Sequence, residues 1–321
     1  MTTVGWVIGA RGMLGKALTS ELERRPEWKL IEATPLPWGS PAELLASAEE
    51  HYSRLLKLAT ETDSSWTIFW VAGSGTIVTS SADLEQQIQD FNTVLSVLAQ
   101  PASAQPGSLF FASSAGGVYG GSENPPFTEE TPPKPISPYG ETKLRMESIV
   151  VASAAKIGIS SLIGRISNLY GPGQKLDKMQ GLISQLALAQ LTPRPAHIVV
   201  PLETVRDYIY VEDCARAICD ACAELLRPQP AGKIRQVTKI IASGEGTSIA
   251  SLLSNIRLVT KKRPNIIVGT SQLTSRNALD LRLKSVVWPH LDSTEYRHLD
   301  SGIKSTLTDV LTSIQEKNPP R

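Results

Sequence analysis

The sequence VGWVIGARGMLG, residues 4–15, combines a short apolar run with a glycine-rich turn. Residues 4–8 predict a buried strand, and the apolar spacing that continues through Leu18 and Leu22 predicts a helix after the turn. Strand, glycine turn and helix in this order are typical of a dinucleotide-binding turn, because glycine permits the tight bend and lets the backbone approach a pyrophosphate. The phosphates would lie at the helix N-terminus, where free N–H groups and the helix dipole favour an anion.

Strand and helix signals continue to alternate beyond this turn. The expected strands are residues 67–72, 109–112, 160–166 and 237–242, and the expected helices are residues 41–60 and 83–98. This alternation predicts an α/β protein with a doubly wound parallel sheet that helices cover on both faces. Ligands of such sheets bind outside the carboxyl ends of the strands, so the glycine turn, Gly73 and Ser114 are expected to lie along one edge.

The second strand, expected at residues 29–33, bears on the choice of cofactor. Many NAD-binding folds place an acidic residue at the end of this strand, where it holds the adenosine ribose hydroxyls. Here residues 33–37 read ATPLP, and Glu32 is expected to lie within the strand. The missing acid and the presence of Arg11 in the glycine turn slightly favour NADP over NAD, with a merely solvated Arg11 as the alternative.

Residues 137–143, SPYGETK, predict the start of another helix that ends near Gly158. The serine suits the N-cap and the proline suits the first helical position. Tyr139 and Lys143 are four residues apart and therefore project from one face. An ammonium group close to a phenol favours the phenolate and lowers the tyrosine pKa from its usual value near 10. The pair is a candidate proton acceptor for an alcohol, and the alternative is an exposed tyrosine beside an exposed lysine.

Composition and charge exclude some classes of function. The chain has 321 residues, of which 41% are hydrophobic, and a net charge of +1. Neither nucleic acid nor a membrane surface is therefore expected as a partner through bulk electrostatics. No apolar run approaches the roughly 18 residues of a membrane span, and the first residues lack the pattern of a signal peptide, so we expect a cytoplasmic protein.

Three cysteines, Cys214, Cys219 and Cys222, lie close together in the sequence. An odd number of cysteines argues against a disulfide framework, and the Cys-x-x-Cys spacing has no second pair with which to complete a zinc site. We interpret them as small buried residues on a helix. No metal is expected.

Five motifs in order resemble the extended short-chain dehydrogenase/reductase superfamily, in its nucleotide-sugar epimerase, dehydratase and ketoreductase branch. They are Gly9-x-x-Gly12-x-x-Gly15, Ser113-Ser114 followed by Val118-Tyr119-Gly120, Tyr139-x-x-x-Lys143, Asn168-Leu169-Tyr170-Gly171-Pro172 and Arg206-Asp207-Tyr208. The resemblance covers about residues 4–242. It implies a dinucleotide-binding Rossmann domain at residues 1–170, completed by about residues 204–242. Residues 171–203 and 243–321 would form a smaller, mixed substrate-binding region.

The resemblance also implies roles for single residues. Tyr139 would act as acid/base on the sugar hydroxyl or ketone, and Lys143 would bind the nicotinamide ribose and lower the Tyr139 pKa. Ser114 would hydrogen-bond the reacting oxygen, although one extra residue before Val118 leaves Ser113 as an alternative. The expected cofactor contacts are Gly9, Arg11, Gly12, Met13, Leu14, Gly15, Ala72, Gly73, Tyr139 and Lys143.

Two further positions match residues that contact substrate phosphates in the family. Asn168 is one, and Arg206, whose guanidinium can grip a diphosphate with forked hydrogen bonds, is the other. The alternative for Arg206 is a surface salt bridge with Asp207 or Asp213.

The implied function is that of an NAD(P)-dependent nucleotide-sugar 4-epimerase or 4-ketoreductase, as a homodimer. Residues 115–117 read AGG where dehydratases of this branch usually carry acidic residues, so 4,6-dehydration is not expected. The cysteines fall outside the expected site, so 3,5-epimerisation is not inferred. A non-catalytic NAD(P)-binding sensor or scaffold and a reductase of a non-nucleotide carbonyl compound remain alternatives.

Overall fold

A six-stranded parallel sheet forms the centre of the protein in the computed structural model, which describes residues 2–73, 75–76, 79–99, 105–176, 181–228, 233–269, 278–292 and 295–317. Its strand order is β2-β1-β3-β4-β5-β9. The strands are β1 (Thr3–Ile8), β2 (Trp28–Leu30), β3 (Ser65–Trp70), β4 (Gly107–Ser114), β5 (Ser160–Ile166) and β9 (Gln236–Ile241). The predicted doubly wound α/β fold is confirmed.

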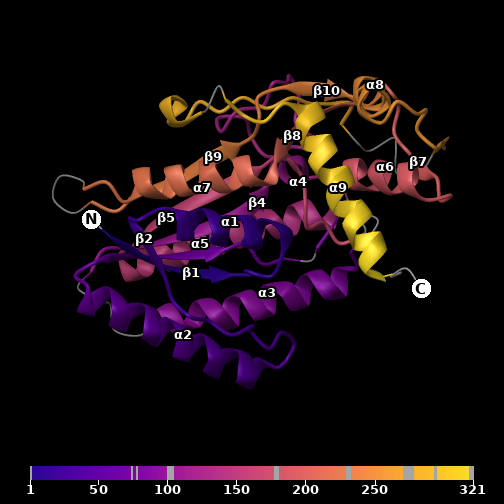
Figure 1. Ribbon diagram of the computed structural model, residues 1–321. Coiled ribbons are helices and arrows are strands. Elements are labelled where there is room, and N and C mark those ends of the chain that lie inside the picture. Colours follow the sequence, from indigo (N-terminus) through magenta and orange to yellow (C-terminus); the bar gives the residue numbers. More distant parts are fainter. Residues whose placement is uncertain are drawn as a thin grey trace.

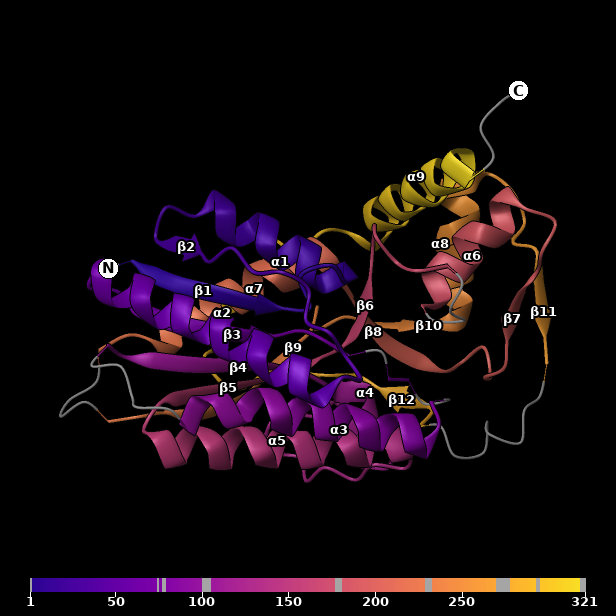
Figure 2. The same cartoon turned by 90° about the horizontal axis from the view of Figure 1, so that it is seen from below.

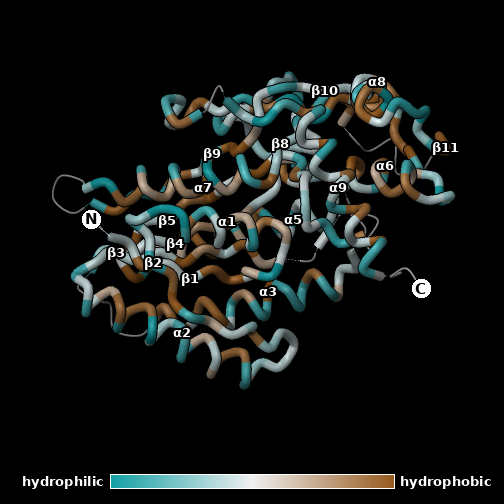
Figure 3. The backbone as a smooth tube through the Cα atoms, in the orientation of Figure 1, coloured by the Kyte–Doolittle hydropathy of each residue, from teal (hydrophilic) through white to brown (hydrophobic). Residues whose placement is uncertain are grey.

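Helices cover both faces of this sheet, as Figure 1 shows. Helices α1 (Met13–Arg24) and α7 (Val211–Leu225) pack on one face, and α2 (Pro41–Glu61), α3 (Ser81–Ser96) and α5 (Pro138–Ile157) pack on the other. Because both faces are buried, the central strands are continuously apolar rather than alternating. Residues 66–70 of β3 are all buried, and the brown stretches of the tube in Figure 3 mark the hydrophobic residues of the sheet and its covering helices.

A smaller region lies beyond the carboxyl ends of the main strands (Figure 2). A second sheet contains β6 (Asn168–Tyr170), β8 (Val205–Tyr210), β10 (Gly246–Ser248) and β12 (Asp280–Leu281). A two-stranded parallel sheet joins β7 (Ala196–Ile198) to β11 (Ile266–Val268). Helices α6 (Leu182–Leu191), α8 (Ile249–Thr260) and α9 (Leu299–Lys317) pack together beside these strands.

Short helical turns complete the chain. They are α4 (Ala115–Val118), η1 (Val97–Ala99) and η4 (Pro289–Leu291). Helix α4 follows β4 directly, so the end of that strand and the start of the turn form one continuous corner beside α5.

The second strand differs from the sequence-based expectation. It ends at Leu30 rather than near Ala33, and Glu32 lies outside it and is exposed. The strand is short because it is an edge strand that pairs only with β1, over three residues. Beyond it, the backbone hydrogen-bonds instead to side chains of α2. An acidic residue therefore does follow the end of the second strand, contrary to the expectation.

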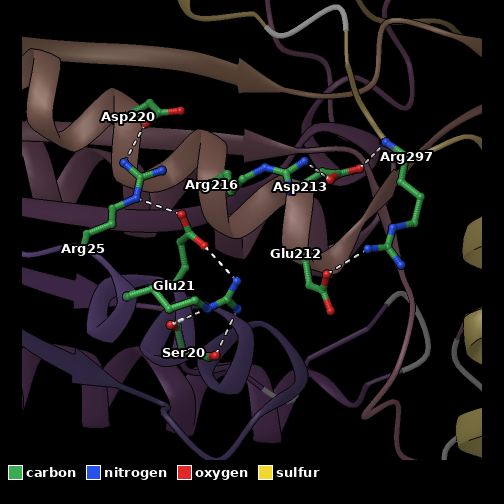
Figure 4. A network of polar contacts seen from close by, with 9 residues as sticks. Ser20, Glu21, Arg25, Glu212, Asp213, Arg216, Asp220 and Arg297 are labelled. Carbon is green, nitrogen blue, oxygen red and sulfur yellow. Dashed lines mark hydrogen bonds and ion pairs between the residues drawn. The ribbon is translucent and has the colours of Figure 1, made fainter.

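Polar contacts attach α7 to α1 and to the segment before α9 (Figure 4). Arg25 donates to Glu21 Oε1 at 2.8 Å and to Asp220 Oδ1 at 2.7 Å. The backbone N–H of Arg297 donates to Asp213 Oδ2 at 2.7 Å. The Arg25 contacts join α1 to α7, and the Arg297 contact joins α7 to the segment before α9.

The three cysteines lie where α7 packs in the core with α1 and the main sheet. Cys214, Cys219 and Cys222 are fully buried, free thiols, as interpreted from the sequence, and burial raises their pKa values. In the part of the chain that the structure describes, no helix has the length and apolar character needed to cross a membrane, and no three histidine, cysteine or acidic side chains gather as metal ligands do.

Candidate active site

The glycine turn between β1 and α1 is tightly packed. Gly9 has a φ of +98°, and a Cβ atom there would lie 2.6 Å from the Ala72 backbone nitrogen. A Cβ atom on Gly15 would lie 2.0 Å from the Gly9 carbonyl oxygen, so only glycine lets α1 approach the turn this closely. Gly12 caps α1 without a side-chain hydrogen bond, and the first turn of the helix has no acidic residue. Unpaired N–H groups and the helix dipole make this end suitable for a phosphate group.

The other residues of this turn differ in how they can reach a ligand. Arg11 is exposed, whereas Leu14 is buried in the core between α1 and α7. Leu14 can therefore contact a cofactor through its backbone but not through its side chain. Met13 is half-buried, and a Cβ atom on Gly173 would lie 3.9 Å from its Cα. The turn that follows β6 thus borders the start of α1.

Lys143 lies at the carboxyl ends of β3 and β4. Its Nζ donates to the Ala112 carbonyl oxygen at 3.0 Å and lies 5.0 Å from the centre of the Phe111 ring. A Cβ atom on Gly73 would be 3.8 Å from the same nitrogen. Burial lowers the pKa of Lys143 to about 8, and the carboxylate of Glu147 opposes this shift. Lys143 therefore lies beside Gly73. The residue before Gly73, Ala72, packs against Gly9 of the glycine turn.

Tyr139 is half-buried between two glycines. Cβ atoms on Gly75 and Gly117 would lie 3.3 Å and 3.1 Å from its ring carbons. Burial raises the pKa of Tyr139 above its ordinary value, and a hydrogen bond with the Ser114 side chain partly lowers it. The phenol is therefore protonated at neutral pH.

The expected lowering of the Tyr139 pKa by Lys143 does not appear in this structure. The ammonium lies 5.8 Å from the centre of the tyrosine ring and is hydrogen-bonded to a backbone carbonyl. Burial of the phenol outweighs the opposing hydrogen bond from Ser114, so the net shift is upward. This balance depends on tertiary packing, which a helical spacing does not reveal.

Ser113 and Ser114 lie on opposite faces of β4, as successive strand residues do. Ser113 Oγ donates to Glu147 Oε1 at 2.5 Å in the protein interior. Ser114 Oγ accepts from the Gly117 backbone N–H at 3.1 Å, and the same side chain acts to lower the Tyr139 pKa. Ser114 is thus the serine beside the tyrosine, and Ser113 belongs to a separate buried network.

That buried network was not anticipated from the sequence. Arg165 on β5 donates to Glu147 Oε2 at 2.7 Å and Oε1 at 3.2 Å, and to the Tyr119 hydroxyl at 2.7 Å. Glu147 and Arg165 are only 5% and 7% exposed, so they form a true interior ion pair. Glu147 follows Lys143 by one helical turn, as Lys143 follows Tyr139. This repeated spacing was the feature of the sequence from which a place for Glu147 near the site could have been inferred.

Asn168 and Arg206 lie on neighbouring strands, β6 and β8. Ser114 at the end of β4 pairs with Ile166 at the end of β5. Asn168 is two residues further along the chain from Ile166. The amide of Asn168 donates to the Asp207 carbonyl oxygen at 2.9 Å, while the residue itself remains exposed. It therefore lies at the same sheet edge as the tyrosine and serine.

Arg206 is half-buried, and its guanidinium donates to the Val205 and Ala278 carbonyl oxygens at 2.8 Å and 2.9 Å. Asp207 and Asp213, the alternative partners considered from the sequence, bind other groups: Asp207 accepts from Ser243 and Gly244, and Asp213 accepts from the Arg297 backbone. Burial lowers the pKa of Arg206, opposed by Tyr208 and Asp280. The side chain is thus held in place by backbone carbonyls.

Comparison with known proteins identifies the class to which this fold and site belong. The chain belongs to the NAD dependent epimerase/dehydratase family, whose model matches residues 6–232. The family prediction made from the sequence motifs is therefore confirmed. The dinucleotide is expected at the glycine turn, where Gly9 and Gly15 allow the close approach that it requires.

Individual relatives differ in activity and in cofactor. The chain is 32% identical over 202 residues to the dTDP-4-dehydro-6-deoxyglucose reductase of Escherichia coli, covering 63% of this chain. It spans 61% of the length of that relative. A UDP-glucose 4-epimerase structure from Thermotoga maritima with UDP-glucose has a TM-score of 0.76 at 21% identity, covering 98% of this chain and 100% of that one. The structure of RMD from Pseudomonas aeruginosa with NADPH has a TM-score of 0.73 at 21% identity, covering 98% of each chain.

Proposed function

We propose that this protein is an NAD(P)-dependent nucleotide-sugar 4-ketoreductase or 4-epimerase. The observation that carries the proposal is the contact of Tyr139 with Ser114, beside Lys143, at the sheet edge where the glycine turn ends. A bound nicotinamide would supply or accept a hydride at the sugar carbon. The chain then has to move a proton at the sugar oxygen and hold both reactants in place.

We assign the proton to Tyr139. Its phenol is protonated at neutral pH because burial raises its pKa. It can therefore donate to a ketone oxygen as that oxygen gains negative charge, and in the reverse direction it takes the proton from the hydroxyl. Ser114 is the second donor to the reacting oxygen, and Lys143 is placed to contact the nicotinamide ribose.

We propose that substrate phosphates lie near Asn168 and Arg206. A guanidinium oriented by two backbone carbonyls keeps other N–H groups for a diphosphate. We propose, as the sequence motifs imply, that residues 1–170, with about 204–242, bind the dinucleotide, although β6 and β8 within these ranges belong to the second sheet. Residues 171–203 and 243–321 would then bind the sugar nucleotide.

Dehydration at C4 and C6 is not part of the proposal. Helix α4 follows Ser114 with the sequence AGGV, which contains no side chain that could transfer a proton. Tyr139 is therefore a candidate for the proton transfer that accompanies hydride transfer, whereas α4 offers no residue that could remove an α-proton.

The choice between NADP and NAD rests on two exposed residues at the adenosine end. Arg11 favours a 2′-phosphate, as expected from the sequence, whereas Glu32 follows the end of β2, where a carboxylate favours the free ribose hydroxyls. We propose that these influences oppose each other, which leaves only a small preference between the two cofactors.

Thermal-shift screening against NAD, NADP and a panel of nucleotide sugars tests the proposed function, because a ligand of the folded state raises its stability. A cofactor that stays bound through purification would support the 4-epimerase, and stoichiometric NADPH consumption would support the 4-ketoreductase. Binding of a dinucleotide without turnover of any sugar would instead support a sensor or scaffold. Light scattering tests the proposed homodimer.

A further inference from the structure

His51 is a buried histidine on the side of α2 that faces β1. It is 1% exposed, and its ring packs edge-on against Trp6 with 5.6 Å between the ring centres. Its Nε2 accepts a hydrogen bond from the Thr34 backbone N–H at 3.1 Å and lies 3.2 Å from the Thr34 hydroxyl. A side chain of α2 thus holds the backbone of the segment that follows β2.

These contacts define the protonation state of the ring. Because Thr34 N–H donates to Nε2, that nitrogen carries no proton, and the proton of the neutral ring is on Nδ1. Nδ1 is buried and has no hydrogen-bond partner within the described residues. A second proton would turn Nε2 into a donor that faces another donor. A protonated Nε2 could still donate to the Thr34 hydroxyl oxygen, but the Thr34 N–H bond that helps to hold residues 32–34 requires a neutral His51.

Residues 32–34 lie where the proposed function places the adenosine ribose. They follow the carboxyl end of β2, which pairs with β1, the strand that leads into the glycine turn, and all three are exposed. Arg54 on α2 provides a second attachment, since it donates to the Glu32 carbonyl oxygen at 3.2 Å. Because side chains of α2 hold the backbone of residues 32–34, their solvent-exposed side chains are well arranged to bind a ligand.

We propose that His51 is a positioning residue for the cofactor. In its neutral form it holds residues 32–34 in the conformation that binds the adenosine end of the dinucleotide, and protonation releases this segment and weakens binding. This inference rests on the proposed function, because it takes the dinucleotide to be the ligand at this edge.

The groups around His51 agree with a neutral ring. Burial lowers its pKa; Glu50 opposes the shift and Arg54 adds to it. Glu50 and Arg54 are ion-paired to each other on the same helix, Trp6 faces the ring from β1, and Thr34 faces it from the segment after β2. Among the residues that the structure describes, the charged groups that act on the His51 pKa are Glu50 and Arg54, both on α2.

Linkage gives the proposal a quantitative form. If cofactor binds the form with neutral His51, it must lower the His51 pKa by the same free energy with which protonation weakens binding. A fall of about one pKa unit corresponds to a dissociation constant about tenfold larger in acid. A histidine with only a structural role would show the same pKa with and without cofactor.

Calorimetry of NAD⁺ binding between about pH 8 and pH 5.5 measures this coupling. NAD⁺ is the main probe because it has no 2′-phosphate, which would itself titrate near pH 6, and NADP⁺ is measured in parallel. The variants are His51→Gln, which cannot become charged, and His51→Leu, which also removes the acceptor. His197→Gln is the matched control, since His197 is exposed on β7. NMR of the four imidazoles follows the His51 pKa with and without NAD⁺.

We expect the wild type and His197→Gln to bind NAD⁺ about three- to fivefold more weakly at pH 5.5 than at pH 8, because a one-unit coupling reaches tenfold only below both pKa values. His51→Gln should lose this pH dependence. His51→Leu should bind about three- to tenfold more weakly than wild type at pH 8, because Thr34 N–H loses its acceptor. An equal pH dependence in wild type and His51→Gln, or a His51 pKa unmoved by NAD⁺, would overturn the inference alone. Failure of the wild type to bind either dinucleotide at pH 8 would overturn the proposed function as well.

Discussion

Replacement of Glu147 by glutamine should affect both stability and the charge of Lys143. Glu147 accepts two hydrogen bonds from Arg165 and one from Ser113, and both members of the ion pair are buried. Glutamine keeps the size and one acceptor oxygen but removes the negative charge. Arg165 would then be a buried cation that has lost its carboxylate partner and keeps only neutral acceptors such as the amide oxygen and the Tyr119 hydroxyl.

The expected magnitude follows from the cost of an unpaired interior charge. Removing one partner of a buried ion pair typically destabilises a protein by about 3–5 kcal/mol. This is a large part of the roughly 5–15 kcal/mol by which domains are usually stable. Adding Arg165→Met removes the remaining charge, so the double variant should recover at least about 1 kcal/mol relative to Glu147→Gln. Urea unfolding measures these free energies.

The effect on Lys143 has a defined sign. Burial already lowers its pKa to about 8, and the negative charge of Glu147 acts in the raising direction. Glu147→Gln removes that influence and leaves Arg165 positive, so the ammonium should lose its proton at a lower pH. The alkaline limb of kcat/KM should therefore move to lower pH in Glu147→Gln and move back in the double variant.

Ser113→Ala is the matched control, because it removes the 2.5 Å hydrogen bond to Glu147 without changing any charge. It should lower stability by about 1 kcal/mol and leave the alkaline limb in place. Equal stability of wild type and Glu147→Gln, or the same alkaline limb in both, would refute the role assigned to this ion pair.

Three further predictions concern the reaction and its ligands. Tyr139→Phe should fold and bind cofactor normally but lose about two to four orders of magnitude in turnover, because only the proton-transferring oxygen is removed; near-normal steady-state kinetics would contradict this. Arg206→Ala should weaken nucleotide-sugar binding and leave cofactor affinity nearly unchanged, and equal losses for both ligands in calorimetry would indicate general destabilisation instead. Arg11→Ala should lower the affinity for NADP(H) relative to NAD(H), and Glu32→Gln should raise it; unchanged ratios of dissociation constants in both variants would rule out the proposed opposition.

Local features of the sequence were enough to predict several elements. Helix α5 begins where SPYGETK predicted it, because the Ser137 hydroxyl accepts from the Gly140 backbone N–H at 3.2 Å. It ends at Gly158, whose φ of 74° is the left-handed conformation that glycine adopts readily. The glycine turn is equally local, since Gly9 and Gly15 meet across a single turn. Signals of this kind act between residues that are close in the chain, so they can be read from a sequence.

The length of the second strand was predicted wrongly for the opposite reason. Nothing near Glu32 in the sequence shows that β1 pairs with only three residues of β2. Nor does it show that His51 and Arg54, from the middle of α2, bind the backbone beyond that strand. Local patterns could therefore not show that the Glu32 carboxylate lies beyond the end of β2.

The sequence by itself determined the family, the alternation of strands and helices in the main sheet, and the placement of Tyr139 and Lys143 on one helix face. Only the tertiary structure showed that Ser114, rather than Ser113, lies beside the tyrosine, and that Glu147 pairs with Arg165 on a distant strand. It also reversed the expected direction of the Tyr139 pKa shift. The physical reason is that burial and charge pairing depend on which segments pack together, and a pKa responds to all of the groups around a side chain rather than to its neighbours in the chain.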